Sequence, residues 1–127
     1  MVEYKFDPPI KIRLDAIITK ANFTNIKPEM VQVIVSSGTK TRAVARIYSF
    51  PRIHQVAFNL APRYVIEIIS EKFFKYSVDE QDKVLIHELM HIPKTFSGAL
   101  VPHKCFGKKV VCAKTVNALW DKMQNSS

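Results

Sequence analysis

The sequence predicts a single α+β domain over residues 1–127, in which helices pack on a small, mostly antiparallel sheet. The length of 127 residues suits one hydrophobic core and not two. The composition, with 47% hydrophobic and 24% charged residues, is typical of a globular chain. Apolar residues also change along the chain from the spacing of a helix to that of a strand and back, which indicates separate helices and strands.

The first half of the chain predicts a helix, then strands with a short helix between them. β-branched runs predict strands at residues 30–37, 43–50 and 64–70. Helical apolar spacing after two prolines, and a segment that follows Pro51, predict helices at residues 10–23 and 52–60. The turn sequence SGTK at 37–40 indicates that the first two strands form an antiparallel pair.

The second half predicts two helices. Ser77 is followed three residues later by Glu80, which is the signature of a capped helix start. This helix is expected to run to about His91, because Pro93 disfavours helical geometry in the residue before it. Residues 124–127 are expected to form a loose tail. One face of a last helix is formed by Phe106, Val110, Ala113, Asn117, Trp120 and Met123.

Two histidines and a glutamate stand together in the apolar run KVLIHELMHIPKTF. His87 and His91 are one helical turn apart, so both imidazoles can reach one metal ion. Glu88 points about a quarter turn away, where it can act as general base on a water at the metal. A pair of hydrogen-bonded core histidines is the alternative, but a metal ion with its water satisfies all three polar groups. We therefore predict one catalytic Zn²⁺, with His87 and His91 as ligands and Glu88 as base.

A zinc hydrolase needs a third protein ligand and keeps the fourth position for water. Downstream of His91 the only His, Asp or Glu residues are His103 and Asp121. The short metzincin spacing fails, because Lys94 and Ser97 stand where its glycine and third histidine belong. We predict His103, at the entry to the last helix, as the third ligand. The weaker candidates are Cys105, Asp121 and Glu67.

The two cysteines and the apolar runs bear on the compartment. Cys105 and Cys112 lie seven apart in the predicted last helix, about 10 Å between α-carbons, which is too far for a disulfide. No apolar run reaches the roughly 18 to 20 residues of a membrane span, and the charged N-terminus does not resemble a secretory signal. We expect a cytoplasmic protein with free thiols.

The net charge of +8 is unevenly distributed, since no acidic residue lies between Glu29 and Glu67. Such a stretch suits an acidic partner, although a charged surface that serves solubility alone is the alternative. It gives a rival function: a basic nucleic-acid-binding module whose zinc is structural, with Cys105 or Cys112 as fourth ligand. The surface expected to meet DNA, or a DNA-bound protein, comprises Lys40, Arg42, Arg46 and Arg52.

Several stretches within residues 43–106 resemble a known family: ARIYSFPRI, YVIEIISEKF, VLIHELMHIPKTFSG and PHKCF. They are similar to archaeal and phage-type zinc metallopeptidases, and to SprT-like proteases, in which HExxH is followed by a histidine opening the next helix and often by Phe three residues on. Here that pair is His103 and Phe106. The resemblance implies a minimal zincin fold, one catalytic zinc and hydrolysis of peptide bonds. SprT-like relatives often act on DNA-bound proteins.

A peptidase of this kind also needs a strand that pairs with substrate and a group that stabilises the oxyanion. The run AVARIYSF is expected to bind extended substrate by strand addition. The sequence does not rank the candidates for the oxyanion group, which are Tyr48, His54, Tyr64, Tyr76 and Lys94.

Overall fold

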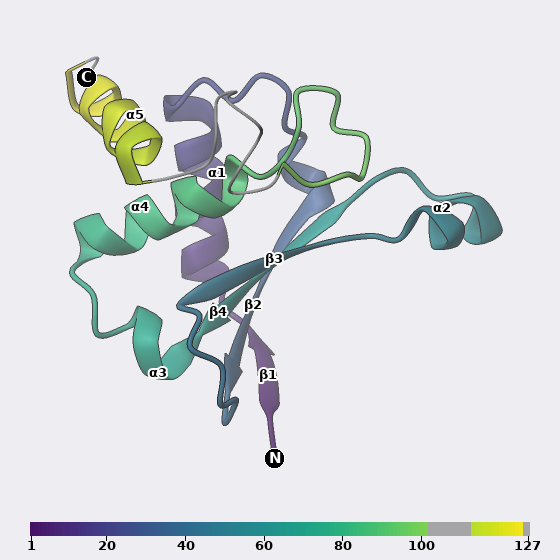
Figure 1. Ribbon diagram of the computed structural model, residues 1–127, viewed down its shortest axis with the longest axis horizontal. Helices are drawn as coiled ribbons and strands as arrows, with labels where there is room; N and C mark the ends of the chain where they lie inside the picture. Colours follow the sequence, from purple (N-terminus) through teal and green to yellow (C-terminus); the bar gives the residue numbers. More distant parts are fainter. Residues whose placement is uncertain (102–112, 126–127) are drawn as a thin grey trace.

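The computed structural model of the chain describes residues 1–101 and 113–125 (Figure 1). Four strands form one sheet in the order β1-β2-β4-β3. The strands are β1 (Glu3–Phe6), β2 (Val31–Ser37), β3 (Ala45–Ser49) and β4 (Tyr64–Ile69). The helices are α1 (Pro8–Lys20), α2 (Arg52–Phe58), α3 (Ser70–Phe73), α4 (Val78–Leu89) and α5 (Ala113–Asn125), with a 3₁₀ turn at Pro28–Met30.

The predicted α+β class with a mostly antiparallel sheet is confirmed. β1 pairs with β2 and β3 pairs with β4 in antiparallel fashion, whereas β2 and β4 are parallel. The expected pairing of residues 30–37 with 43–50 is wrong, because β4 lies between these strands. β4 is buried at five of its six positions, which suits a central strand, while the half-buried β3 suits an edge.

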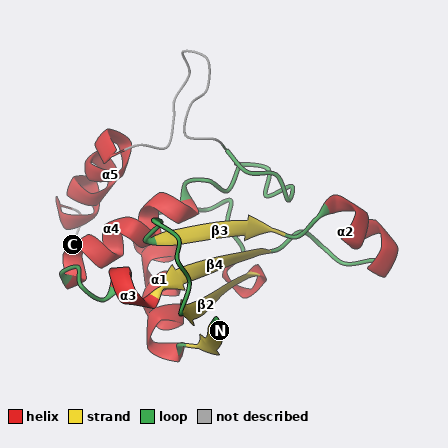
Figure 2. Cartoon of the chain, turned by 60° about the horizontal axis from the view of Figure 1, so that its bottom comes forward, coloured by secondary structure: helices red, strands yellow, loops and turns green. Residues whose placement is uncertain are grey.

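The core lies on one face of this sheet. Alternate residues of β2, Val31, Val33 and Val35, are buried, as the period of two requires. They pack in one hydrophobic cluster with buried side chains of α1 and α4, among them Leu14 and Leu85. Helices α1 and α4 therefore cover one face (Figure 2), and the opposite face leaves aromatic side chains of β1 and β3 exposed to solvent.

The predicted helix boundaries differ from the structure by a few residues. α1 begins at Pro8 and not at residue 10. The Asp7 side chain caps this start by accepting a hydrogen bond from the Ile10 amide at 3.2 Å. It ends at Lys20 instead of residue 23, since Asn22 has a left-handed φ of 60°. α5 continues through Asn125, so the predicted loose tail is wrong for residues 124 and 125.

Two elements were absent from the prediction. β1 is exposed along its whole length, so it lacks the apolar alternation by which a strand is recognised. The four-residue helix α3 is too short to show a helical apolar period. Within the described ranges, no helix is long and apolar enough to cross a membrane.

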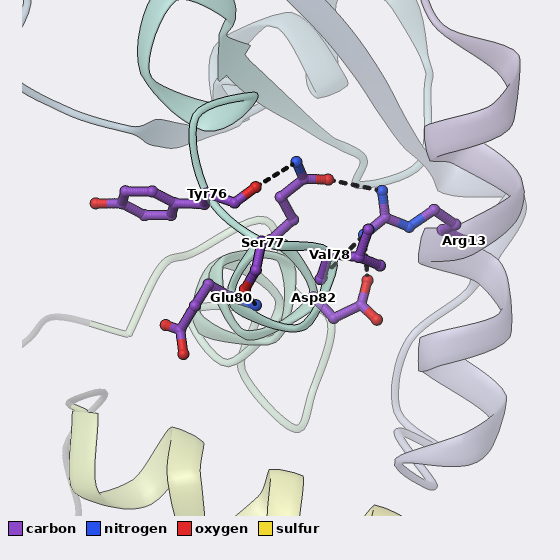
Figure 3. A network of polar contacts seen from close by, with 7 residues as sticks. Arg13, Tyr76, Ser77, Val78, Glu80 and Asp82 are labelled. Atoms are coloured by element: carbon purple, nitrogen blue, oxygen red, sulfur yellow. Dashed lines mark hydrogen bonds and ion pairs between the residues drawn. The ribbon is translucent and has the colours of Figure 1, made fainter.

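A polar network joins α4 to α1 at the start of α4 (Figure 3). Arg13 of α1 donates hydrogen bonds to the Gln81 side chain at 2.9 Å and to the Asp82 carboxylate at 2.5 Å. The Ser77 hydroxyl accepts a hydrogen bond from the Glu80 amide at 3.2 Å, which confirms the predicted helix cap. The network and the cap fix where α4 begins, and therefore where its later turns lie.

A second polar cluster, on the open face of the sheet, joins the edge strand β3 to β4. The Glu67 carboxylate of β4 is buried and accepts hydrogen bonds from Arg46 at 3.0 Å and from the Tyr48 hydroxyl at 2.7 Å. Burial acts to raise the pKa of Glu67, but its interactions with Tyr48, Ser36 and the charged Arg46 outweigh burial and hold the pKa below its usual value.

This cluster predicts an acid-sensitive contribution to stability. Because the folded-state pKa of Glu67 is lowered, its stabilisation is present above pH 4.5 and is lost as the pH falls through the folded value. Glu67→Gln should therefore lower the free energy of unfolding more at about pH 7 than at about pH 3, measured by urea denaturation. An equal loss at both pH values would contradict this account, and Glu29→Gln, at an exposed glutamate, is the control.

Candidate metal centre

Helix α4 presents one set of polar residues to a cleft and its apolar residues to the core. Leu85, Ile86 and Leu89 are fully buried against the sheet side. The residues of this helix and its following turn that line the cleft recur at spacings of about three or four, which is one helical face. They are Glu80, Lys83, Val84, His87, Glu88 and His91.

The helix ends just before the second histidine. The Met90 amide donates to the Ile86 carbonyl at 2.9 Å, and the His91 amide donates to the Glu88 carbonyl at 3.1 Å in a tighter turn. The prediction that the helix extends to about His91 is therefore close, with the last regular residue at Leu89. His91 nevertheless remains one turn from His87.

The two imidazoles of the predicted site face each other. The Nε2 atoms of His87 and His91 are 3.4 Å apart. Two nitrogens bound at about 2.0–2.1 Å to one tetrahedral zinc ion are about 3.3–3.4 Å apart. The distance in the structure therefore suits one ion held between them.

The surroundings of His91 fix the state of its ring. Its Nδ1 lies at hydrogen-bonding distance from the Val101 carbonyl, and a carbonyl oxygen can only accept. Nδ1 therefore carries the hydrogen, so that in the neutral ring the lone pair lies on the Nε2 that faces His87. The Val101 amide also donates to the His91 carbonyl at 2.7 Å, so backbone and ring are held by the same residue.

Glu88 is a buried carboxyl next to this pair. Its Oε2 lies 3.8 Å from the His87 Nε2, and burial raises its pKa to about 8. A carboxylate in such a position is stable only when a cation balances its charge. The two imidazole nitrogens can therefore supply two ligands to a divalent metal ion, and the carboxyl of Glu88 lies beside them without completing a set of three within the described residues.

The cleft in front of these residues has a volume of about 780 Å³. Its opposite wall is the edge strand β3, and α5 contributes a third side. No strand among the described residues pairs with the outer edge of β3. The apolar part of the lining comprises Ala43, Val44, Ala45, Ile47, Val84, Leu100, Val101, Ala113 and Val116.

The third predicted ligand, His103, lies outside the described residues, as do Cys105 and Cys112. Residues 1–101 and 113–125 contain no group of three or more metal-binding side chains. Glu67, a weaker candidate, is engaged with Arg46 and Tyr48 on the open face of the sheet. The third ligand therefore stays a prediction.

The structure places the five oxyanion candidates in different surroundings. Only Tyr48 lines the cleft, and its hydroxyl donates to Glu67. Tyr64 is buried and fixes the loop after α4 through hydrogen bonds with Gly98 and Ala99. The remaining candidates are exposed and do not line the cleft: His54, Tyr76 and Lys94.

Sequence reasoning missed two polar residues of the cleft, Lys83 and Asn117. Lys83 precedes His87 by four residues, so the helical spacing that identified the histidines could have identified it. Asn117 comes from α5, and no local pattern indicates that α5 lies against α4.

The basic residues expected to meet DNA lie within and on either side of β3 and do not form one cluster. Lys40 and Arg42 are exposed in the loop before β3, and Arg52 is exposed at the start of α2, beyond the other end of that strand. Arg46 lies between them and forms an ion pair with Glu67.

Comparison with known proteins agrees with the geometry of the site. The family described as "Putative phage metallopeptidase" matches residues 2–124. The chain therefore belongs to this metallopeptidase family, and membership implies a hydrolase that uses a metal cofactor. Comparisons with the curated proteins and with the solved structures found no match.

Proposed function

We propose that the chain is a zinc-dependent metallopeptidase that hydrolyses peptide bonds in extended protein segments. The observation that supports this most strongly is the 3.4 Å separation of the His87 and His91 Nε2 atoms beside the buried carboxyl of Glu88. Family membership supports the same class of reaction. His87 and His91 would hold the zinc ion, with His103 as the proposed third ligand.

When bound, zinc lowers the pKa of water and polarises the scissile carbonyl group. The Glu88 carboxylate accepts the proton of the attacking water and passes it to the nitrogen of the leaving amine. Burial raises the pKa of Glu88 to about 8 in the metal-free chain, and a zinc ion held beside it would favour the carboxylate form that accepts the proton. Lys83 and Asn117 supply hydrogen-bond donors in the cleft for the developing negative charge.

The edge strand β3 provides the proposed binding surface for substrate. Its outer edge carries backbone amides and carbonyls that an extended peptide can pair with by strand addition. Ala45 and Ile47 point to the core side of the sheet, where their β4 partners are Ile68 and Ile66. Alternate substrate side chains would therefore lie toward the apolar cleft and toward the open face.

Cleavage of an unfolded protein by the zinc-loaded chain tests this function. Activity should be lost when a chelator removes the metal, and it should return when zinc is added back. The rival function, a nucleic-acid-binding module with a structural zinc, predicts no cleavage of any protein substrate and loss of folding on chelation. The buried Glu88 favours the enzyme, because a structural site gives that carboxyl no role.

Binding to DNA is a separate proposal, supported by the net charge of +8 and by exposed Lys40 and Arg42. DNA affinity should fall steeply with salt, and Lys40→Glu with Arg42→Glu should weaken it at least about tenfold, measured by fluorescence anisotropy. Glu29→Lys, which raises the net charge elsewhere, is the control. Affinity that is absent even at low salt would leave the basic residues with solubility alone.

A further inference from the structure

The segment between β3 and β4, residues 50–63, forms an arm that projects beyond the end of the sheet (Figures 1 and 2). Helix α2 lies at its outer end. Four large apolar side chains of the arm are exposed: Ile53 at 69%, Val56 at 65%, Phe58 at 68% and Leu60 at 41%. Apolar side chains gathered on one projecting element are typical of a surface that binds a partner.

The arm is internally braced. Gln55 is buried and its side chain donates to the Phe50 carbonyl at 2.9 Å, while the Leu60 amide donates to the Gln55 carbonyl at 3.0 Å. Asn59 ends α2 in a left-handed conformation with φ of 54°. A surface that is already ordered loses less conformational entropy on binding than a loose loop does.

The arm also lies close against the loop that follows α4. Gly98 has φ of +94°, and a Cβ there would lie 2.5 Å from the Gln55 side-chain nitrogen. The loop therefore approaches Gln55 as closely as glycine allows. Two residues later Leu100, exposed at 40%, lines the cleft.

The edge strand connects the cleft to the arm without interruption. β3 lines the cleft as far as Tyr48, and the chain enters α2 four residues later at Arg52. A peptide paired with the outer edge of β3 therefore leaves the cleft at Tyr48 toward the apolar residues of the arm.

Charge indicates what the arm would bind. The arm carries Arg52 and Arg63 and no acidic residue. The net charge of +8 opposes association between two copies of the chain. The chemistry suits an unfolded polypeptide segment with apolar side chains flanked by acidic ones.

We propose that the arm is a docking site for the part of the substrate that lies next to the segment held in the cleft. The substrate class is then an unfolded polypeptide that carries an apolar, acid-flanked segment a few residues from the cleaved bond. This inference rests on the proposed peptidase function and adds a second point of contact, which raises affinity without changing the chemistry.

Two synthetic substrates separate the arm from the cleft. One is a peptide of about six residues, which covers β3 alone. The other is the same peptide with an apolar, acid-flanked extension of about eight residues, made in one version at the N-terminus and in a second version at the C-terminus. The extension at one end should raise kcat/KM at least about tenfold, through a lower KM. The variant Ile53→Ser with Val56→Ser should lose this gain and cleave the short peptide within about twofold of wild type.

Two surface residues give a matched control. Ile12 on α1 and Val78 on α4 are exposed at 69% and 62%, close to the values for Ile53 and Val56. Ile12→Ser with Val78→Ser should keep the full gain from the extension. A gain that persists in the arm variant, or an equal loss for both peptides, would overturn the inference.

Binding measured by fluorescence anisotropy on the same proteins keeps the two proposals distinguishable. Binding of the extended peptide that depends on the arm, without cleavage of either peptide, would overturn the peptidase function and keep the docking site. Cleavage without any effect of the extension would overturn only the docking site. A wild-type dimer that the arm variant converts to monomers would also overturn it, because the arm would then bind a second copy.

Discussion

Replacement of Glu88 by glutamine is expected to lower peptidase activity at least about a hundredfold and to leave metal content near that of the wild type. Glutamine keeps the shape of the side chain but cannot accept the proton of the attacking water. Hydrolysis of an unfolded protein and metal analysis of the same samples measure the two quantities. Asp79→Asn, at an exposed carboxylate in the first turn of α4, should leave both unchanged.

The outcome separates three accounts of Glu88. Lost activity with retained metal supports the role of base. Lost metal would make Glu88 a ligand, which the proposed geometry does not include. Cleavage by the Glu88→Gln protein at the wild-type rate would contradict the mechanism, whatever its metal content.

The second large effect concerns the two histidines. His87→Ala or His91→Ala should lower zinc from about one ion per chain to less than about a tenth, because two remaining ligands hold zinc poorly. Activity should be lost with the metal. His54→Ala, which removes a histidine of α2, should keep the zinc and is the control for metal content.

His103→Ala extends this test to the residue outside the described ranges. If His103 is the third ligand, zinc affinity and activity should fall together, as for His91→Ala. Metal analysis across a range of zinc concentrations measures the change in affinity. Unchanged affinity would direct attention to Cys105 or Asp121 as the third ligand.

Local patterns predicted most of the elements that position the site. The helix cap at Ser77, the helix break before Pro93 and the spacing of His87 and His91 depend on neighbours in sequence, so they could be read directly. Most predicted helices and strands appear for the same reason, within a few residues. The class of the fold followed from their order.

Contacts between distant segments could not be predicted in the same way. β4 lies between β2 and β3 because it is the strand that is buried on both of its faces. The turn sequence at 37–40 indicated instead that the strands on either side of it pair with each other. The hydrogen bond from His91 to Val101 and the place of Asn117 in the cleft depend on loop and helix packing. The unexpected residues of the site therefore come from segments far from α4 in sequence, as Val101 and Asn117 do, or from the turn of α4 before the histidines, as Lys83 does.

The coordination of zinc in the loaded protein tests the central claim most directly. X-ray absorption at the zinc edge distinguishes nitrogen and oxygen ligands at about 2.0–2.1 Å from sulfur at about 2.3 Å. The proposed function predicts one zinc ion with only nitrogen and oxygen ligands, consistent with histidines and an open position that water fills. A sulfur ligand would contradict the ligand set of His87, His91 and His103, and it would favour the rival site in which a cysteine holds a structural zinc.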